Sequence, residues 1–176
     1  NTTTGQAYTF DTGLGATNYC RLEMVNGGTM YRGGAVTIGG GGSLLMSNTV
    51  ATLAETLTSA GVVTLCNATG VFSKPFANHG RLEGDGTLSG AVTNFAGSVV
   101  APGGTNGTGV LTVTGAFGMK AGSTLACGID GVDRHDGLVL SAGSTLDLGG
   151  CDLAATLGCA PEAGASFTLI DNQGGN

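Results

Sequence analysis

The stretch that decides the fold runs from Ser98 to Gly131 and reads SVVAPGGTNGTGVLTVTGAFGMKAGSTLACGIDG. Short apolar strands such as VLTV, Val110 to Val113, are separated in it by glycine-rich turns such as APGG, Ala101 to Gly104. The phrase GSTLACGI at Gly122 to Ile129 returns as GSTLDLGG at Gly143 to Gly150. Similar phrases roughly 20 residues apart predict stacked, similar rungs, as in a β-solenoid.

The composition agrees with an all-β protein. The chain has 176 residues, which suits one domain with its own core, and it contains 35 glycines, no Trp and 10% charged residues. Its many Val, Thr and Leu residues argue against disorder, and glycine does not recur at every third position as in collagen. We therefore expect residues 1–176 to form a single-domain, all-β parallel β-solenoid with short glycine-rich turns.

The charge balance and the length of the apolar runs argue against a nucleic-acid partner and a membrane span. The formal net charge is −6 with only six Lys and Arg residues, so the chain is poorly suited to neutralise a phosphate backbone, and we expect no nucleic-acid partner. No apolar run reaches the length of a transmembrane helix, so we expect no membrane span in this chain. The chain opens at Asn1 without Met, which suggests a processed or trimmed form.

Two segments in the first third of the chain allow more than one interpretation of their structure or role. In residues 1–15, Tyr8 and Phe10 alternate with Thr9, which predicts a strand that either caps the first rung or pairs with a neighbouring molecule. Capping is the commoner case. The segment Asn48 to Ser59 is the only candidate helix, because four apolar residues fall at helical spacing. Its four threonines favour strand or loop instead.

Five cysteines raise the question of disulfides: Cys20, Cys66, Cys127, Cys151 and Cys159. No CxxC pair occurs, so a zinc knuckle is not indicated. Cys151 and Cys159 flank a short loop and are the first candidate pair, and Cys20 with Cys66 is the weaker one. Cys127 would then be a buried thiol on an alternating strand. Reduced cysteines acting as small core residues are the alternative, and an odd number also permits an intermolecular bond.

The richest polar cluster comprises Asp130, Asp133, Arg134, His135 and Asp136. Carboxylates beside a basic partner suit a carbohydrate-active site or a calcium site. A solvated turn between two rungs is the interpretation we favour, because Asp side chains readily accept hydrogen bonds from turn N–H groups. No nucleophile elbow, HExxH or P-loop motif occurs. We therefore expect no catalytic, cofactor-binding or metal-binding residues.

The two histidines and three asparagines in N-x-S/T sequons are weak candidates for functional sites. His79 and His135 are the only histidines, and without paired ligand spacing we expect each to lie in a surface loop. Asn1, Asn67 and Asn106 each begin an N-x-S/T sequon. They are candidate glycosylation sites only in a cell that has the machinery.

The second half of the chain, best over residues 98–170, resembles the passenger-associated repeat region of autotransporter-type surface proteins. The pattern V-x-P-G-x-x-x-x-G-x-L-x-V-x-G-x-F begins here at Val100 and ends at Phe117. It is followed by GSTL, by Asp136 before an L-x-L strand, and by FTLI at Phe167 to Ile170. The resemblance implies a right-handed parallel β-helix on a bacterial cell surface or outside the cell. The cysteines depart from this family, whose passengers are usually cysteine-poor.

The same resemblance extends to the rung phrase from Gly80 to Gly90, NxGxLxGxGxLxG with its preceding Asn78. In such a rung Leu82 and Leu88 would point inward. The intervening glycines would let the backbone turn at positive φ.

Two classes of function follow. The first is a non-enzymatic extracellular module, either an adhesive surface stalk or a subunit that assembles end to end into a fibre through its open end rungs. Its partners would be copies of itself and a host or matrix glycan or protein. The alternative is a carbohydrate-active β-helix enzyme resembling polysaccharide lyases or hydrolases. Three Tyr and no Trp offer such an enzyme few stacking platforms.

Overall fold

The structure is a computed structural model that describes residues 8–9, 16–18, 21–25, 30–32, 35–104 and 107–174. Within these residues the regular structure is all β-strand, and almost every strand pair is parallel. The all-β parallel class predicted from the sequence is confirmed at this level. The segment 48–59 contains strands β7 (Val50–Leu53) and β8 (Leu57–Ser59), so the strand interpretation is right and the helix is not. No helix in the described residues is long and apolar enough to cross a membrane.

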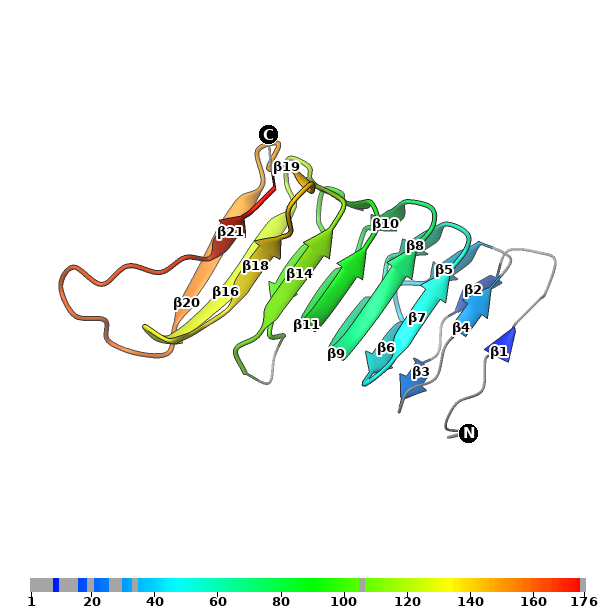
Figure 1. Cartoon of the computed structure of the whole chain (residues 1–176), viewed down its shortest axis with the longest axis horizontal. Coiled ribbons are helices and arrows are strands. Elements are labelled where there is room, and N and C mark those ends of the chain that lie inside the picture. Colours follow the sequence, from blue (N-terminus) through cyan, green and yellow to red (C-terminus); the bar gives the residue numbers. More distant parts are fainter. Residues whose placement is uncertain are drawn as a thin grey trace.

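The strands form three stacks that run along the long axis of the molecule (Figure 1). Stack I is the seven-stranded sheet of β2 (Ala16–Asn18), β5 (Val36–Ile38), β8, β10 (Phe76–Asn78), β12 (Val92–Asn94), β15 (Ala116–Met119) and β19 (Thr145–Asp147). Stack II contains β3 (Arg21–Val25), β6 (Ser43–Ser47), the first halves of β9 (Val62–Phe72) and β11 (Arg81–Ser89), β13 (Val99–Pro102), β16 (Thr124–Gly131) and β20 (Asp152–Leu157).

Stack III contains β1 (Tyr8–Thr9), β4 (Met30–Arg32), β7, the second halves of β9 and β11, β14 (Val110–Thr114), β18 (Gly137–Leu140) and β21 (Ile170–Asn172). Stacks II and III share one sheet because β9 and β11 bend from one stack into the other. The short strand β17 (Arg134–His135) pairs antiparallel with β16 as a hairpin. The predicted N-terminal strand is present as β1, which pairs with β4, while residues 1–7 and 10–15 lie outside the described residues.

The chain visits stacks I, II and III in a fixed order, and we call one such pass a repeat. Each strand pairs in register with the strand of the same stack in the next repeat, so equivalent side chains form columns. The stack I column contains Val36, Leu57, Phe76, Val92, Phe117 and Leu146. The first five of these are at most 6% exposed.

The inward columns of all three stacks belong to one hydrophobic core. In stack II the column contains Leu44, Val63, Leu82, Val100 and Leu125, none more than 1% exposed. Burial of one such side chain stabilises the fold by about 1.5–3 kcal/mol. The expectation that Leu82 and Leu88 point inward is confirmed, since both are fully buried.

Two buried asparagines add a polar column inside stack I. Asn78 Nδ2 donates a hydrogen bond of 2.9 Å to Asn94 Oδ1, and Asn94 Nδ2 donates one of 3.1 Å to the carbonyl oxygen of Gly118. Both side chains are fully buried. Because each amide reaches the next repeat, a slip in register would leave buried polar atoms without partners.

The corner between stacks II and III changes along the chain. In β9 it is made at Asn67, which adopts a left-handed backbone with φ of 48°. In later repeats the same corner is replaced by residues 103–109, by the hairpin turn 130–136 and by the long segment 158–169. The last of these projects away from the body at the C-terminal end (Figure 1). Among the residues that the structure describes, the longer insertions therefore lie at this one corner.

Adjacent leucines in β6 give a matched test of the core. Leu44 is fully buried, whereas Leu45 faces outward and is half-buried. We expect Leu44→Ala to lower the free energy of unfolding by about 2–5 kcal/mol, because it leaves a cavity in the column. Leu45→Ala should cost less than about 1 kcal/mol. Urea unfolding followed by circular dichroism measures both, and equal midpoints would contradict the assigned inward face.

Candidate functional site

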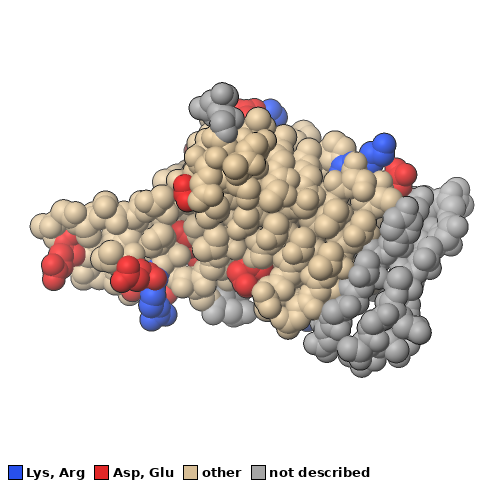
Figure 2. Space-filling view, in the orientation of Figure 1, with Lys and Arg blue, Asp and Glu red and all other residues tan. Residues whose placement is uncertain are grey.

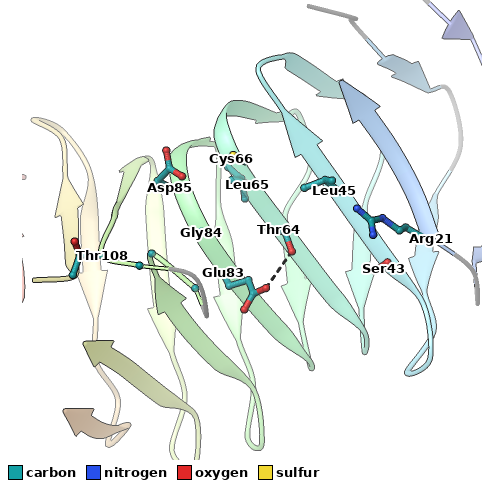
Figure 3. A pocket seen from close by; sticks show the side chains of 13 residues that line it. Arg21, Ser43, Leu45, Thr64, Leu65, Cys66, Glu83, Gly84, Asp85 and Thr108 are labelled. Carbon is teal, nitrogen blue, oxygen red and sulfur yellow. Dashed lines mark hydrogen bonds between the residues drawn. The ribbon is translucent and has the colours of Figure 1, made fainter. Parts of the chain in front are cut away.

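A groove of about 600 Å³ lies on the outer face of stack II, beside the segment that follows β13 (Figure 3). Its lining residues come from β3, β6, β9 and β11 and from that segment: Arg21, Ser43, Leu45, Thr64, Leu65, Cys66, Glu83, Gly84, Asp85, Gly103, Gly104, Gly107 and Thr108. The groove is therefore assembled from strands that are distant in sequence and adjacent in the stack.

Two carboxylates from β11 line this groove. Glu83 and Asp85 alternate with the inward Leu82, so both face outward. Glu83 forms an ion pair with Arg81 and accepts a hydrogen bond of 3.3 Å from Thr64 Oγ1. Asp85 Oδ2 accepts a hydrogen bond of 3.1 Å from the backbone N–H of Asn67. Each carboxylate therefore already has a partner within the fold.

The floor of the groove is glycine for a packing reason. Gly84 has φ of 103°, and a Cβ on it would overlap the carbonyl oxygen of Leu65 in the preceding repeat. Gly103 and Gly104 form part of the wall with φ of 74° and 70°. Among the described residues that line the groove none is aromatic. A sugar in this groove would therefore find hydrogen-bonding groups and no ring to stack on.

The polar cluster expected at residues 130–136 does not converge on one site. Asp130, Asp133 and Arg134 are exposed around the hairpin between β16 and β17, whereas Asp136 is 4% exposed and faces the interior. The turn interpretation of this segment is therefore right for the hairpin. Nowhere in the part of the chain that the structure describes do three or more His, Cys, Asp or Glu side chains group so as to hold a metal ion.

Asp136 anchors the corner loops. Its Oδ1 accepts a hydrogen bond of 2.9 Å from the N–H of Gly109, and its Oδ2 accepts one of 2.7 Å from the N–H of Gly128. A Cβ on Gly103 would overlap Oδ1, so the wall of the groove packs directly on this carboxylate. Charged acceptors make stronger hydrogen bonds than neutral ones, so the two backbone donors offset the free-energy cost of burying the Asp136 carboxylate. Asp136 thus positions the segment that borders the groove.

The two histidines have different environments. His79 lies in an exposed bend, as expected, and its ring stacks on Phe95 with centroids 4.4 Å apart. The expectation of a surface loop is wrong for His135, which lies in β17, is half-buried and meets the edge of Phe167 at 5.9 Å. His135 Nδ1 lies 3.0 Å from the backbone oxygen of Asp136, which fixes the ring against the hairpin.

The expected disulfide between Cys151 and Cys159 is not formed, and both are free thiols. The segment between them is strand β20 and not a loop. A strand of six residues spans about 20 Å, whereas a disulfide needs Cα atoms within about 7 Å. Cys159 Sγ instead lies 3.6 Å from the carbonyl oxygen of Ile129. Cys66 is also a free thiol, and Cys20 lies outside the described residues.

Cys127 is a buried thiol, as predicted from its place on an alternating strand, and is 2% exposed. Burial, with a smaller contribution from the negative charge of Asp136, raises the pKa of Cys127 from 9.0 to about 11. The thiol form is therefore the one that the folded core stabilises.

Of the three candidate glycosylation sites, only Asn67 is described. It is exposed, but its Nδ2 donates a hydrogen bond of 2.9 Å to Asn48 Oδ1, and the next residue, Ala68, is buried. Attachment of a glycan to Nδ2 would compete with this contact between two repeats. Asn1 and Asn106 lie outside the described residues.

Comparisons of this chain with protein-family models, with curated proteins and with solved structures find no match. The groove and the stacked core are therefore interpreted from their own geometry. Sequence reasoning missed the groove, although the period of two around Leu82 already placed Glu83 and Asp85 on one outer face.

The anchor role of Asp136 predicts a loss of stability on a nearly isosteric change. Asp136→Asn replaces one accepting oxygen with an NH₂ group, which faces the N–H of Gly109 or Gly128 without a hydrogen bond. We expect unfolding in urea to become easier by about 1–3 kcal/mol. Asp133→Asn, a change in the exposed turn, is the control and should stay within about 0.5 kcal/mol of the wild type. A wild-type midpoint for Asp136→Asn would argue against the anchor.

The raised pKa of Cys127 predicts selective thiol chemistry. At pH 8 iodoacetamide should modify the exposed Cys66 in the folded protein, while Cys127 should react about 100-fold more slowly when folded than when unfolded, because the rise of its own pKa from 9.0 to about 11 removes that fraction of its thiolate. The folded state binds this proton more tightly than the unfolded state. Its stabilising effect is therefore complete below pH 9.0 and lost as the pH rises to about 11. Mass spectrometry of peptides gives the rates, and equal rates in the folded protein would contradict the assigned burial.

Proposed function

We propose that this chain is a β-solenoid, right-handed as the passenger resemblance implies, and that it acts as a non-enzymatic structural or adhesive module outside a bacterial cell. The observation that carries the proposal is the set of in-register columns that continue through successive repeats into one core. Parallel strands about 4.8 Å apart that each bury an edge on the next build a stiff rod. Such a rod suits a stalk that holds another part at a distance.

The outer surface supports the same proposal. The outward column of stack III contains the uncharged residues Val50, Thr69, Thr87, Thr112 and Val139 and ends at Asp171. Figure 2 shows that most of this face is uncharged and that Asp and Glu side chains gather toward the C-terminal end, on the left. An even, uncharged sheet face suits adhesion to a neutral glycan or protein matrix better than the capture of an ion or a phosphorylated ligand.

A second candidate, a carbohydrate-active enzyme, is favoured by one observation, the pair of carboxylates Glu83 and Asp85 in the groove. Against it, Glu83 is tied to Arg81 and Asp85 to the backbone of β9, so neither is held as a free acid or base. The structural role therefore remains our proposal.

A paired assay separates the two functions. The purified chain and the variant Glu83→Gln/Asp85→Asn are incubated with a panel of polysaccharides, and released reducing ends and unsaturated sugars are measured. We expect no product from either protein, and both should keep the wild-type circular dichroism spectrum. Asp130→Asn/Asp133→Asn makes the same change of charge outside the groove and serves as the control.

Product from the wild type that disappears only in the groove variant would replace the structural proposal with the enzymatic one.

The proposed extracellular location is tested by a separate experiment. Antibodies to the chain should label intact cells of the native source, and external protease should remove the label. Label that appears only after the cells are lysed would contradict an extracellular module.

A further inference from the structure

The last strand of stack II carries apolar side chains that the core does not cover. Leu153 pairs in register with Leu125, and Leu157 pairs with Ile129. The partners are 1% and 5% exposed, whereas Leu153 is 60% and Leu157 58% exposed. The segment 158–169 projects beyond the end repeat (Figure 1) and does not shield them. These leucines therefore hold inward positions while most of their surface meets solvent.

The backbone of β20 is open along one edge. Within the described residues β20 pairs with β16 and with no other strand. The N–H of Asp152 donates a hydrogen bond of 2.8 Å to the carbonyl oxygen of Ser123, so Asp152 directs its backbone groups toward β16. Successive residues of a strand direct these groups to opposite sides. The N–H and C=O groups of Leu153, Ala155 and Leu157 therefore point to the open edge.

The net charge of the chain lies at this same end. Residues 1–120 contain five Lys or Arg and five Asp or Glu, so their formal charge is zero. Residues 121–176 contain one Arg and seven Asp or Glu, which accounts for the full net charge of −6. Figure 2 shows acidic side chains gathered toward the C-terminal end. Such an end attracts a basic partner and repels an acidic one.

Two carboxylates flank the open edge of β20. Asp152 begins the strand, alternates with the inward Leu153 and is exposed. Asp130 lies beside Gly158, the residue after β20, so closely that a Cβ on Gly158 would overlap its Oδ1. Neither carboxylate has an ion pair among the described residues, whereas Lys120 Nζ binds the nearby Asp147 at 2.9 Å. The edge is thus apolar with an acidic group at each end.

We propose that β20 binds an extended segment of another protein, which adds a strand to stack II and combines inward apolar residues with Lys or Arg at both ends. Main-chain hydrogen bonds to Leu153, Ala155 and Leu157 would hold this segment, and its apolar side chains would cover the exposed leucines. Its basic residues would meet Asp152 and Asp130. The inference goes beyond the structural role proposed above and does not depend on it, because it follows from β20 and its surroundings.

A second copy of the chain fits this edge less well, for two reasons. In the N-terminal part of the chain β1 already pairs with the outer edge of β4, so β4 cannot continue the stack that β21 ends. The C-terminal end of a second copy carries the same excess of acidic residues, so two such ends repel each other. Charge therefore favours a separate, basic strand as the partner.

Fluorescence anisotropy with a labelled synthetic peptide tests the proposal on the purified chain. The probe is KLTVTLK with blocked termini, which alternates as the edge requires and reads the same in both strand directions. We expect saturable binding. The scrambled peptide KLLVTTK and the charge-reversed peptide ELTVTLE should each bind about tenfold more weakly or worse. Equal affinity for the three peptides, or no binding of KLTVTLK, would overturn the inference.

Variants of the chain separate the apolar and the charged contributions. Leu153→Glu/Leu157→Glu should raise the Kd for KLTVTLK about 30-fold, because it places charge where the leucines of the peptide lie. Asp130→Asn/Asp152→Asn should raise it about fivefold at low salt and less at high salt, since exposed ion pairs are screened. Val132→Glu is the matched control for the leucine variant, because Val132 is 61% exposed on the lateral hairpin and should leave the Kd unchanged.

Amide hydrogen exchange followed by NMR tests the geometry of the complex. KLTVTLK should slow exchange of the N–H groups of Leu153, Ala155 and Leu157 about tenfold, while those of Ala154 and Thr156, which face β16, should change little. Uniform protection, or none, would contradict an added strand. Sedimentation velocity without peptide identifies the other occupant. Oligomers that grow with concentration and that Leu153→Glu/Leu157→Glu abolishes would assign the edge to a second copy and overturn this inference.

Discussion

In-register parallel pairing is the constraint on which the rest of this structure depends. Each residue of a strand has a fixed neighbour in the repeat before and after it, so a column must accept the same kind of side chain throughout. Leu44, Val63 and Leu82 satisfy this rule with similar apolar volumes. Gly84 satisfies it differently, because its backbone lies so close to Leu65 that no Cβ fits. The glycine content of the chain is thus partly a consequence of close stacking and not only of turns.

The same constraint explains where the molecule can vary. A column tolerates no extra residue, but the corner between stacks II and III is outside every column. Asn67 closes this corner in β9 at φ of 48°, and the repeats after β11 have longer segments there, namely 103–109, 130–136 and 158–169. Asp136 then makes an insertion compatible with the core, since it binds the N–H groups of Gly109 and Gly128. The groove on stack II exists because such an anchored segment stands beside a flat strand face.

Local patterns allowed much of the fold to be predicted from the sequence. The buried thiol of Cys127 follows from alternation within one strand, and the inward position of Leu82 is implied by the resemblance to a passenger-type rung. The groove does not follow from such patterns, because contacts such as Thr64 with Glu83 depend on which strands stack side by side. The disulfide prediction failed for a related reason. Cys151 and Cys159 are close in sequence, and only the pairing of the intervening residues with β16 shows that they are held apart as an extended strand.

A strand at the end of a stack has no next repeat to cover it, so its outer backbone edge and its inward-facing side chains stay exposed. A strand that ends a stack can carry polar residues at the inward positions and so avoid association. β20 does not do this: Leu153, Ala155 and Leu157 keep the inward apolar pattern of β16, and Asp152 and Thr156 keep a polar outer face. Its sequence is that of an interior strand. The exposed residues at the inward positions of β20 are therefore the ones that one more repeat of the same cross-section would bury.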